Sequence, residues 1–218
     1  MPASHTAPRV EHRRRRSPEE RPQQILDAAL EIFGEQGLAA ARLDDIARRA
    51  GIAKGTIYLY FPTKEELFKA VVRREVVTRI EGAEQFQRDN AALPTADLLR
   101  RFLANYWNSI HQKTSTSMFR IVISELQKFP DVAEFYGREV VARAWSVVAA
   151  MIQRGIDRGE FRPVDANLVT RVFVASFLMH GIWIRPDSPT YPLLKHLKPD
   201  DLRDSLIDFL LSSLAPRA

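Results

Sequence analysis

The chain has 218 residues, of which 45% are apolar and 27% are charged, the mixture of a soluble globular protein with ample length for a buried core. This composition excludes a wholly disordered chain, and the absence of cysteine excludes disulfides, zinc–thiolate sites, iron–sulfur clusters and thiol nucleophiles. The longest charge-free stretch in the apolar part of the chain is 172–184, which is shorter than the roughly 18 to 20 residues that span a bilayer. Without a secretory signal at the N-terminus, the sequence indicates a cytoplasmic protein that does not enter the membrane.

The net charge of +5 is concentrated in the first third of the chain. Residues 1–79 carry 15 Lys and Arg against 11 Asp and Glu, whereas residues 80–218 carry 17 against 16. A basic segment of this kind is typical of a surface for nucleic acid or an anionic membrane, although a solvated tail would have the same composition. Four consecutive arginines at 13–16 lie in segment 1–18, which we expect to be a flexible basic arm.

Apolar residues recur at the helical period in each block between prolines, and no segment shows a convincing strand pattern. The sequence therefore predicts an all-α fold. In the first block, Ile25, Ala29 and Phe33 share one face of a helix that we expect to end near Gly37. Thr63 opens a capping box and predicts the start of another helix.

The helices of the remaining chain are expected to begin at acidic caps that follow prolines. Asp131 predicts a long helix that ends near residue 158, and Asp165 and Asp200 are the expected N-caps of the last two helices. Further helices are expected over 95–112 and 115–128. The proline-rich segment 185–199 is expected to be irregular.

The stretch 43–61 has the spacing of a helix-turn-helix. That motif needs a small residue where the two helices approach, a residue that tolerates positive φ in the turn, and an apolar residue that packs the second helix onto the first. Ala47, Gly51 and Ile57 meet these needs in that order. Any compact three-helix unit can contain such a spacing. The residues on the exposed face are therefore needed as further evidence for a DNA-binding motif.

That exposed face is polar or aromatic, with no carboxylate among its members, and it is typical of contacts with phosphates and a groove. Its members are Arg42, Lys54, Thr56, Tyr58, Tyr60 and Lys64. A membrane-surface helix would instead present apolar residues there. The alternative of a helical protein-interaction or membrane-surface module without operator binding is therefore less favoured.

Two sequence patterns carry a resemblance to a known family. They are Ile25-Leu-x-Ala-Ala-x-x-x-Phe33-x-x-x-Gly37 and Ile46-Ala-x-x-Ala-Gly51-Ile-x-x-Gly55-Thr-Ile-Tyr58-x-Tyr60-Phe61-Pro62-x-Lys64-x-x-Leu67. With them, segment 19–79 resembles the DNA-binding domain of the TetR family of bacterial transcriptional regulators. The resemblance implies a three-helix DNA-binding domain with its helix-turn-helix at 42–61, a larger helical effector-binding and dimerisation domain over 80–218, and about nine helices in all. It also implies a homodimeric repressor that binds palindromic double-stranded DNA and is released by a small effector.

The resemblance also implies a role for each residue of the exposed face. The N-terminal part of the recognition helix, which enters the major groove, is lined by Lys54, Gly55, Thr56 and Tyr58. Tyr60 and Lys64 are expected to clamp phosphates. Arg42 departs from the Ser or Thr that the family often has at this N-cap, since an arginine can reach the same phosphate but caps less well.

The larger segment 80–218 is rich in aromatic residues, which at helical spacing are more often core than pocket. A regulator nevertheless requires a cavity, and apolar, aromatic-lined cavities are the usual small-molecule sites. We expect a mostly apolar effector, with two histidines as the polar groups that orient it. The candidate effector residues are Phe102, Tyr106, His111, Phe119, Trp145, Phe177 and His180.

The last two expected helices, 165–184 and 200–215, are apolar on more than one face, which indicates burial on two sides. At this position we expect a four-helix dimer interface. Its candidate residues are Phe173, Phe177, Leu202, Leu206, Phe209 and Leu210.

Motifs of enzyme chemistry are missing from the sequence. It contains no glycine-rich phosphate loop, no nucleophile elbow and no zinc-protease helix, and its five histidines lack metal-ligand spacing. We therefore expect no enzyme activity, no metal site and no cofactor.

Overall fold

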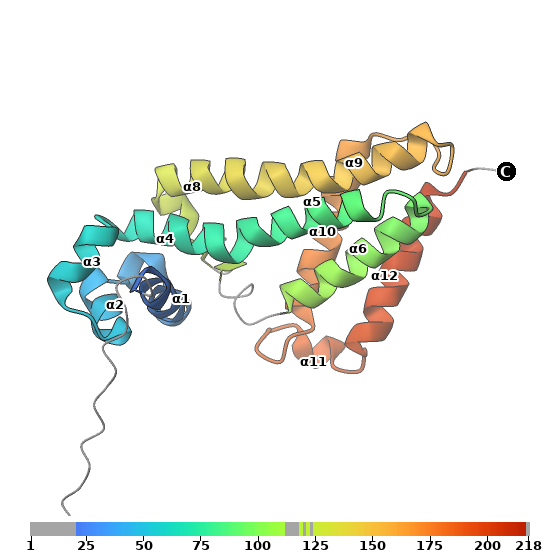
Figure 1. The fold of residues 1–218 in the computed structure, drawn as a ribbon. Coiled ribbons are helices and arrows are strands. Elements are labelled where there is room, and N and C mark those ends of the chain that lie inside the picture. Colours follow the sequence, from blue (N-terminus) through green and yellow to red (C-terminus); the bar gives the residue numbers. More distant parts are fainter. Residues whose placement is uncertain (1–20, 112–117, 120, 123, 217–218) are drawn as a thin grey trace, which may run out of the picture.

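The computed structural model describes residues 21–111, 118–119, 121–122 and 124–216, and these residues form helices and turns without a strand. The expected all-α fold is confirmed. Figure 1 shows a small N-terminal unit at one end and a larger helical unit at the other, joined by long helices. The expected basic arm 1–18, with its arginines, lies outside the described residues.

The N-terminal unit contains α1 (Arg21–Ala40), α2 (Leu43–Ala50), α3 (Lys54–Tyr60) and α4 (Lys64–Val72). Its core includes the fully buried Ile25, Phe33, Ile46, Ile57 and Phe68. Gly37 interrupts α1 with φ 78° and ψ 175°, at the position where the sequence predicts the end of the first helix.

The helix-turn-helix forms as the sequence predicts. Gly51 ends α2 in the left-handed conformation with φ 70° and ψ 31°, which glycine adopts without steric cost. The next backbone N–H, that of Ile52, donates to the carbonyl of Ala47 at 3.0 Å. Ala47 and Ile57 are both buried, and α2 packs against α3, in agreement with the prediction.

Two long helical rods lie side by side and connect the units (Figure 1). One is α4, the π-helical turn η2 (Arg73–Val77) and α5 (Thr78–Asp89); the other is α8 (Pro130–Tyr136), the π-helical turn η4 (Gly137–Ala142) and α9 (Arg143–Asp157). The remaining elements are α6 (Thr95–Ile110), η3 (Leu126–Lys128), α10 (Ala166–Trp183), α11 (Tyr191–Leu194) and α12 (Pro199–Leu214). The short helix α11 therefore lies within the segment that was expected to be irregular.

Two of the predicted caps are confirmed and two are wrong. The Thr63 side chain accepts from the N–H of Glu66, and the Asp165 carboxylate accepts from the first N–H groups of α10. Asp131 and Asp200 cap nothing, because α8 and α12 begin one residue earlier, at a proline. Proline has a helical φ and no N–H, so it occupies the first helical position itself and moves the aspartate to the second.

The helix α10 differs from the expectation that no segment is long and apolar enough for a bilayer. With 18 residues and a mean hydropathy of 1.2, it reaches that length and composition. In the folded chain, however, α10 packs against α9, α6 and α12. A mostly buried core helix passes the same test, and 28% of α10 is buried within this chain.

Candidate DNA-binding surface and ligand cavity

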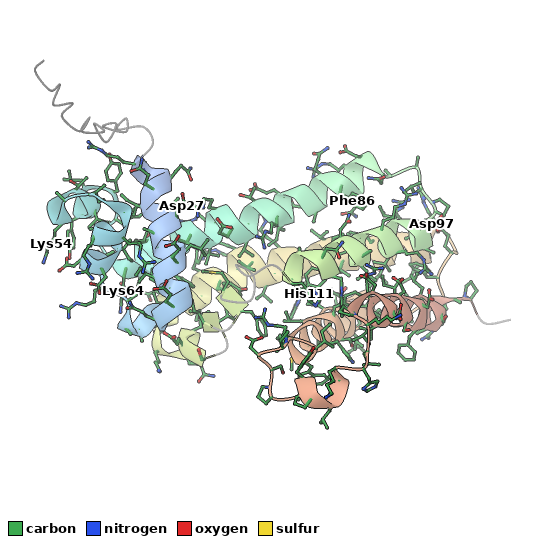
Figure 2. The ribbon with its side chains drawn as sticks, turned by 90° about the horizontal axis from the view of Figure 1, so that it is seen from below. Asp27, Lys54, Lys64, Phe86, Asp97 and His111 are labelled. Atoms are coloured by element: carbon green, nitrogen blue, oxygen red, sulfur yellow. The ribbon has the colours of Figure 1, made fainter. Side chains whose placement is uncertain are left out.

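Helix α3 exposes nearly all of its side chains at the outer end of the N-terminal unit. Ile57 is its buried residue, whereas Tyr58 is 45% exposed and Leu59 is 84% exposed. Figure 2 shows Lys54 at this end of the molecule, away from Asp97 at the opposite end. The expected recognition helix therefore presents its side chains outward.

Gly55 is open on the side where a side chain would stand. No atom lies within 4 Å of the position that a Cβ would take, and the φ of Gly55 is not positive. Neither packing nor backbone conformation therefore requires glycine here.

A carboxylate that the sequence reasoning missed lies among the expected DNA contacts. Asp44 of α2 pairs with the Lys54 ammonium at 2.7 Å and accepts a hydrogen bond from the Tyr58 hydroxyl at 3.3 Å. The hydrogen bond from Lys54 lowers the pKa of the Asp44 carboxyl, and the same contact raises the pKa of Lys54. Asp44 thus holds two of the predicted contact residues in place. Asp44 and Lys54 lie ten residues apart on two different helices, so no spacing in the sequence indicated that they would pair.

The expected phosphate clamp is only partly exposed. The Lys64 ammonium donates to the carbonyls of Ala39 at 2.6 Å and Ala41 at 3.4 Å, and it lies 5.6 Å from the ring centroid of Phe129. Lys64 is therefore turned toward the end of α1. Arg42 is exposed and makes no side-chain cap, as its departure from Ser or Thr predicts.

Of the other expected contact residues, Tyr60 is exposed and Thr56 is partly buried. All seven predicted DNA-contact residues come from α3 and its immediate neighbours, from Arg42 to Lys64.

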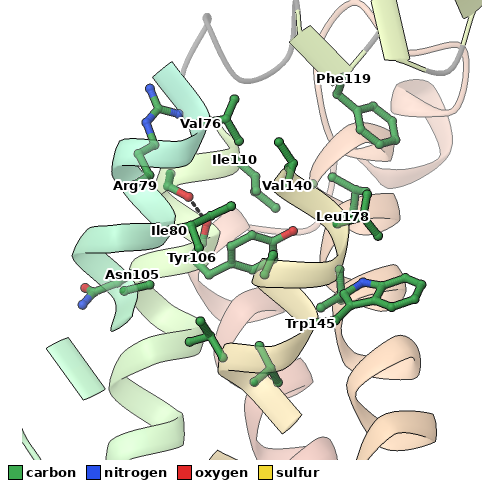
Figure 3. A pocket seen from close by; sticks show the side chains of 18 of the residues that line it. Val76, Arg79, Ile80, Asn105, Tyr106, Ile110, Phe119, Val140, Trp145 and Leu178 are labelled. Atoms are coloured by element: carbon green, nitrogen blue, oxygen red, sulfur yellow. Dashed lines mark hydrogen bonds between the residues drawn. The ribbon is translucent and has the colours of Figure 1, made fainter. Parts of the chain in front are cut away.

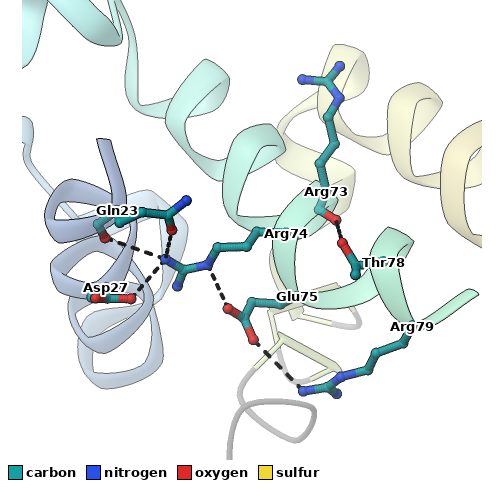
Figure 4. A network of polar contacts seen from close by, with 7 residues as sticks. All are labelled: Gln23, Asp27, Arg73, Arg74, Glu75, Thr78 and Arg79. Carbon is teal, nitrogen blue, oxygen red and sulfur yellow. Dashed lines mark hydrogen bonds and ion pairs between the residues drawn. The ribbon is translucent and has the colours of Figure 1, made fainter. Parts of the chain in front are cut away.

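Among the described residues, hydrogen bonds tie α1 to parts of the chain beyond α4 at two points. Arg74 of η2 donates to Asp27 at 2.8 Å and to the side chain of Gln23 at 3.3 Å, both on α1 (Figure 4). The same guanidinium pairs with Glu75 at 2.7 Å. At the second point, a carboxylate oxygen of Glu125 accepts from the N–H of Ala39 at 2.6 Å.

A cavity of about 730 Å³ lies in the larger unit, between α5, α6, α9, α10 and the segment around 118–122 (Figure 3). Its walls are mostly apolar. Of the predicted effector residues, Phe102, Tyr106, Phe119 and Trp145 line it. Four of the seven candidate residues therefore lie at the wall of one cavity.

The other three predicted effector residues do not line the cavity. Phe177 is fully buried and packs its ring against Trp107, with centroids 5.8 Å apart. Both histidines turn back onto their own helices, because the Nδ1 of His111 lies 2.7 Å from the Trp107 carbonyl and that of His180 lies 2.8 Å from the Ser176 carbonyl. In each histidine one ring nitrogen is paired with its own helix, whereas Nε2 of His111 is buried without a hydrogen-bond partner among the described residues.

Sequence reasoning also missed polar residues of the cavity wall. Tyr136 at the end of α8 lines it, as do Arg79, Arg171 and Arg185. Arg171 is a charged residue among the apolar residues of α10, and it was the one feature of the sequence that could have indicated a polar group in the cavity wall.

Three of the predicted interface residues, Phe173, Phe177 and Leu210, are buried within this chain and have no surface left for a partner. Phe209, in contrast, is 70% exposed, and Leu202 and Leu206 are half-buried. A stripe of exposed apolar residues with helical spacing runs along α10. It contains Leu168, Val172 and Met179.

Comparisons with known proteins match both units. The family model for bacterial regulatory proteins of the TetR family matches residues 25–71, and that for the tetracyclin repressor-like C-terminal domain matches residues 95–197. The transcriptional repressor KstR2 of Mycolicibacterium smegmatis is 28% identical over 79% of this chain and 83% of its own length. The transcriptional regulator SrpR of Pseudomonas putida is 28% identical over 75% of this chain and 74% of its own.

The fold is shared with solved structures. FadR from Bacillus subtilis, determined in complex with stearoyl-CoA, has a TM-score of 0.67 and 20% identity, covering 88% of this chain and 98% of FadR. Regulators of this type bind operator DNA and small-molecule effectors, and they are not enzymes. With both units matched and the helix-turn-helix formed, the chain belongs to the TetR family of bacterial transcriptional regulators.

Proposed function

We propose that this regulator is a repressor that binds a palindromic operator as a homodimer and that a small, mostly apolar effector releases it. The DNA-binding part of this proposal rests on the open space around Gly55. Nothing among the described residues requires glycine at this position, whereas a backbone that approaches DNA closely does.

The side chains around Gly55 supply both kinds of contact that a recognition helix needs. Lys54, Thr56 and Tyr58 face the major groove, and the exposed Leu59 adds an apolar group suited to a thymine methyl. Arg42 and Tyr60 contact phosphates on either side, which sets the position of α3 without reading sequence. The Lys64 ammonium has three N–H donors, of which two contact carbonyls, and the third contacts a phosphate.

The homodimer is supported by the exposed apolar groups of the last two long helices. Leu168, Val172 and Met179 of α10, together with Phe209 of α12, form a surface that a second copy would cover. A two-fold dimer places two copies of α3 in successive major grooves, about 34–36 Å apart. That symmetry requires a palindromic operator.

The cavity supports an apolar effector. A pocket of about 730 Å³ with mostly apolar walls is within the usual range for a small-molecule site. FadR, which shares the fold, was determined with stearoyl-CoA, a ligand with a long apolar chain. These two facts together favour a lipophilic ligand for this chain.

Two continuous segments connect the cavity with the N-terminal unit. The rod that begins at Thr63 carries Val76 and Ile80 on the cavity wall, and the segment around residue 119 lines the cavity before Glu125 contacts Ala39. A ligand releases the DNA only if it binds more tightly to a dimer whose α3 helices no longer match the half-site spacing. Both segments run from the cavity wall to the N-terminal unit, so they are placed to transmit ligand binding in the cavity to the position of α3.

The test is fluorescence anisotropy with DNA from upstream of the chain's own gene and with scrambled DNA of equal length. We expect a preference for the upstream DNA and a fall in affinity of tenfold or more between 50 and 200 mM salt, because several phosphate contacts release counterions. Replacing Tyr58 by Ala should reduce the preference, whereas replacing Tyr191 on α11 by Ala should not. Equal affinity for both DNAs at every salt concentration would refute operator binding.

A further inference from the structure

The described part of the cavity wall carries charge of one sign only. Its charged residues are Arg79, Arg171 and Arg185, and no aspartate, glutamate or lysine is among the described residues that line it. The rest of the wall is mostly apolar. A cavity of this kind favours an anionic ligand over a cationic one, because a bound ligand meets positive charge without a compensating carboxylate.

Arg171 differs from the other two arginines in having no partner. Arg79 forms an ion pair with Glu75 at 3.8 Å, and Arg185 forms one with Asp187 at 2.9 Å. The Arg171 guanidinium forms neither an ion pair nor a hydrogen bond with any described residue, and no carboxylate lies one turn away from it along α10. A ligand anion would compete with a carboxylate at Arg79 and at Arg185, but not at Arg171.

The helix α10 turns one face toward the cavity along most of its length. The lining residues on this face recur at the helical period and are Arg171, Val174, Ala175, Leu178, Gly181 and Ile182. At the rise of an α-helix, the face extends about 16 Å from the first of them to the last. Arg171 is exposed, whereas Gly181 is buried. The face therefore begins with a solvated charge and continues as apolar wall.

The neighbouring helix α6 shows which end of the cavity Arg171 occupies. The rings of Tyr106 and Phe177 have centroids 6.3 Å apart, and Ile110 lies against Gly181, so α6 and α10 run past the cavity in the same direction. Arg171 consequently belongs to the end of the cavity opposite Ile110. Figure 3 shows Leu178 and Trp145 on the side of the cavity away from Arg79, so Arg79 comes from a different wall.

We propose that Arg171 is the head-group site of the cavity and that the effector is an amphipathic anion, a lipophile that carries a carboxylate. The proposal rests on the effector cavity of the proposed function. The apolar body of the ligand lies along the cavity face of α10, and its carboxylate stays at the exposed end. A guanidinium offers two parallel N–H donors to a carboxylate, and this charge-assisted pair is stronger beside apolar walls than in open water.

The experiment compares three ligands with the same apolar chain by calorimetry with the full-length protein. Decanoate carries a carboxylate, 1-decanol is neutral and decylammonium is a cation. The quantity measured is the ratio of two dissociation constants, decanol over decanoate, in the wild type and in Arg171→Gln. The matched control is Arg101→Gln, because Arg101 of α6 is also exposed and without a partner among the described residues but does not line the cavity.

We expect the wild type to bind decanoate most tightly and decylammonium most weakly. The ratio should fall about tenfold or more in Arg171→Gln, because a hydrogen bond to a charged group contributes a factor of roughly ten or more. Affinity for decanol should not change, and Arg101→Gln should keep the wild-type ratio. Rising salt should weaken decanoate binding in the wild type more than in Arg171→Gln, since ions screen an exposed charge pair.

The other outcomes would overturn the proposal in distinguishable ways. Equal affinity of the wild type for decanoate and decanol would overturn the anionic effector. A preference for decanoate that Arg171→Gln leaves unchanged would overturn the head-group site and leave an effector cavity. Failure of every probe to bind would overturn the head-group site and the effector cavity together, and operator binding by the same sample would show whether the DNA-binding part still holds.

Light scattering on the same samples separates a ligand contact from a subunit contact. Arg171 precedes Val172, which belongs to the exposed apolar stripe of α10. We expect Arg171→Gln to have the same oligomeric state as the wild type. A variant with an altered oligomeric state would assign Arg171 to the interface and overturn the head-group site.

Discussion

Gly37, the residue that interrupts α1, makes a sharp test of how the two units are joined. Its φ of 78° and ψ of 175° lie in a region that is essentially restricted to glycine. A Cβ built there would lie 2.0 Å from a carboxylate oxygen of Glu125, the residue that accepts from the N–H of Ala39. The substitution Gly37→Ala therefore strains the backbone and also displaces Glu125.

The two effects have estimable sizes. The backbone strain costs about 1–3 kcal/mol. Loss of the Glu125 hydrogen bond adds about 1 kcal/mol, which is below the roughly 1.5–3 kcal/mol of a charged acceptor because the bond is exposed. We expect Gly37→Ala to lower the free energy of unfolding by about 2–4 kcal/mol, a large part of the roughly 5–15 kcal/mol of a typical domain.

Chemical denaturation at one fixed protein concentration measures these values for four proteins: wild type, Gly37→Ala, Glu125→Ala and the double variant. Fixed concentration matters because a dimer makes apparent stability depend on it. We expect about 1 kcal/mol for Glu125→Ala alone and no further loss when it is added to Gly37→Ala, since that carboxylate has already been displaced. Wild-type stability of Gly37→Ala, or losses that simply add in the double variant, would refute the reasoning.

Three further predictions concern the surface and the interface. Gly55→Ala should lower operator affinity about tenfold or more in anisotropy while leaving thermal stability unchanged or slightly higher, because alanine favours a helix; undiminished affinity would contradict close approach of the backbone to DNA. Asp44→Asn removes the carboxylate that pairs with Lys54, so affinity for scrambled DNA at low salt should rise a few-fold; unchanged affinity would mean that Lys54 does not face the DNA. Phe209→Glu should yield a monomer in light scattering and Phe209→Leu a dimer, because a charge in an apolar interface costs several kcal/mol by order of magnitude; a dimeric glutamate variant would place the interface elsewhere.

The sequence by itself determined the local structure of this protein. Ala47, Gly51 and Ile57 specify the helix-turn-helix because their roles depend on neighbours only a few residues away, and the structure has all three where they were expected. The same holds for the Thr63 and Asp165 caps, whereas the prolines before Asp131 and Asp200 competed for the first helical position. Helical periodicity likewise identified α10 and α12 as apolar on several faces.

Only the tertiary structure decided which neighbour covers each apolar face and which partner each polar group finds. Phe173 and Phe209 look alike in the sequence, yet one is buried within the chain and the other is 70% exposed. Lys64 turns toward the end of α1, and His111 bonds to its own helix instead of facing the cavity. Periodicity states that a face is apolar, but the packing of elements distant in sequence determines whether that face meets the core, a cavity or the surface.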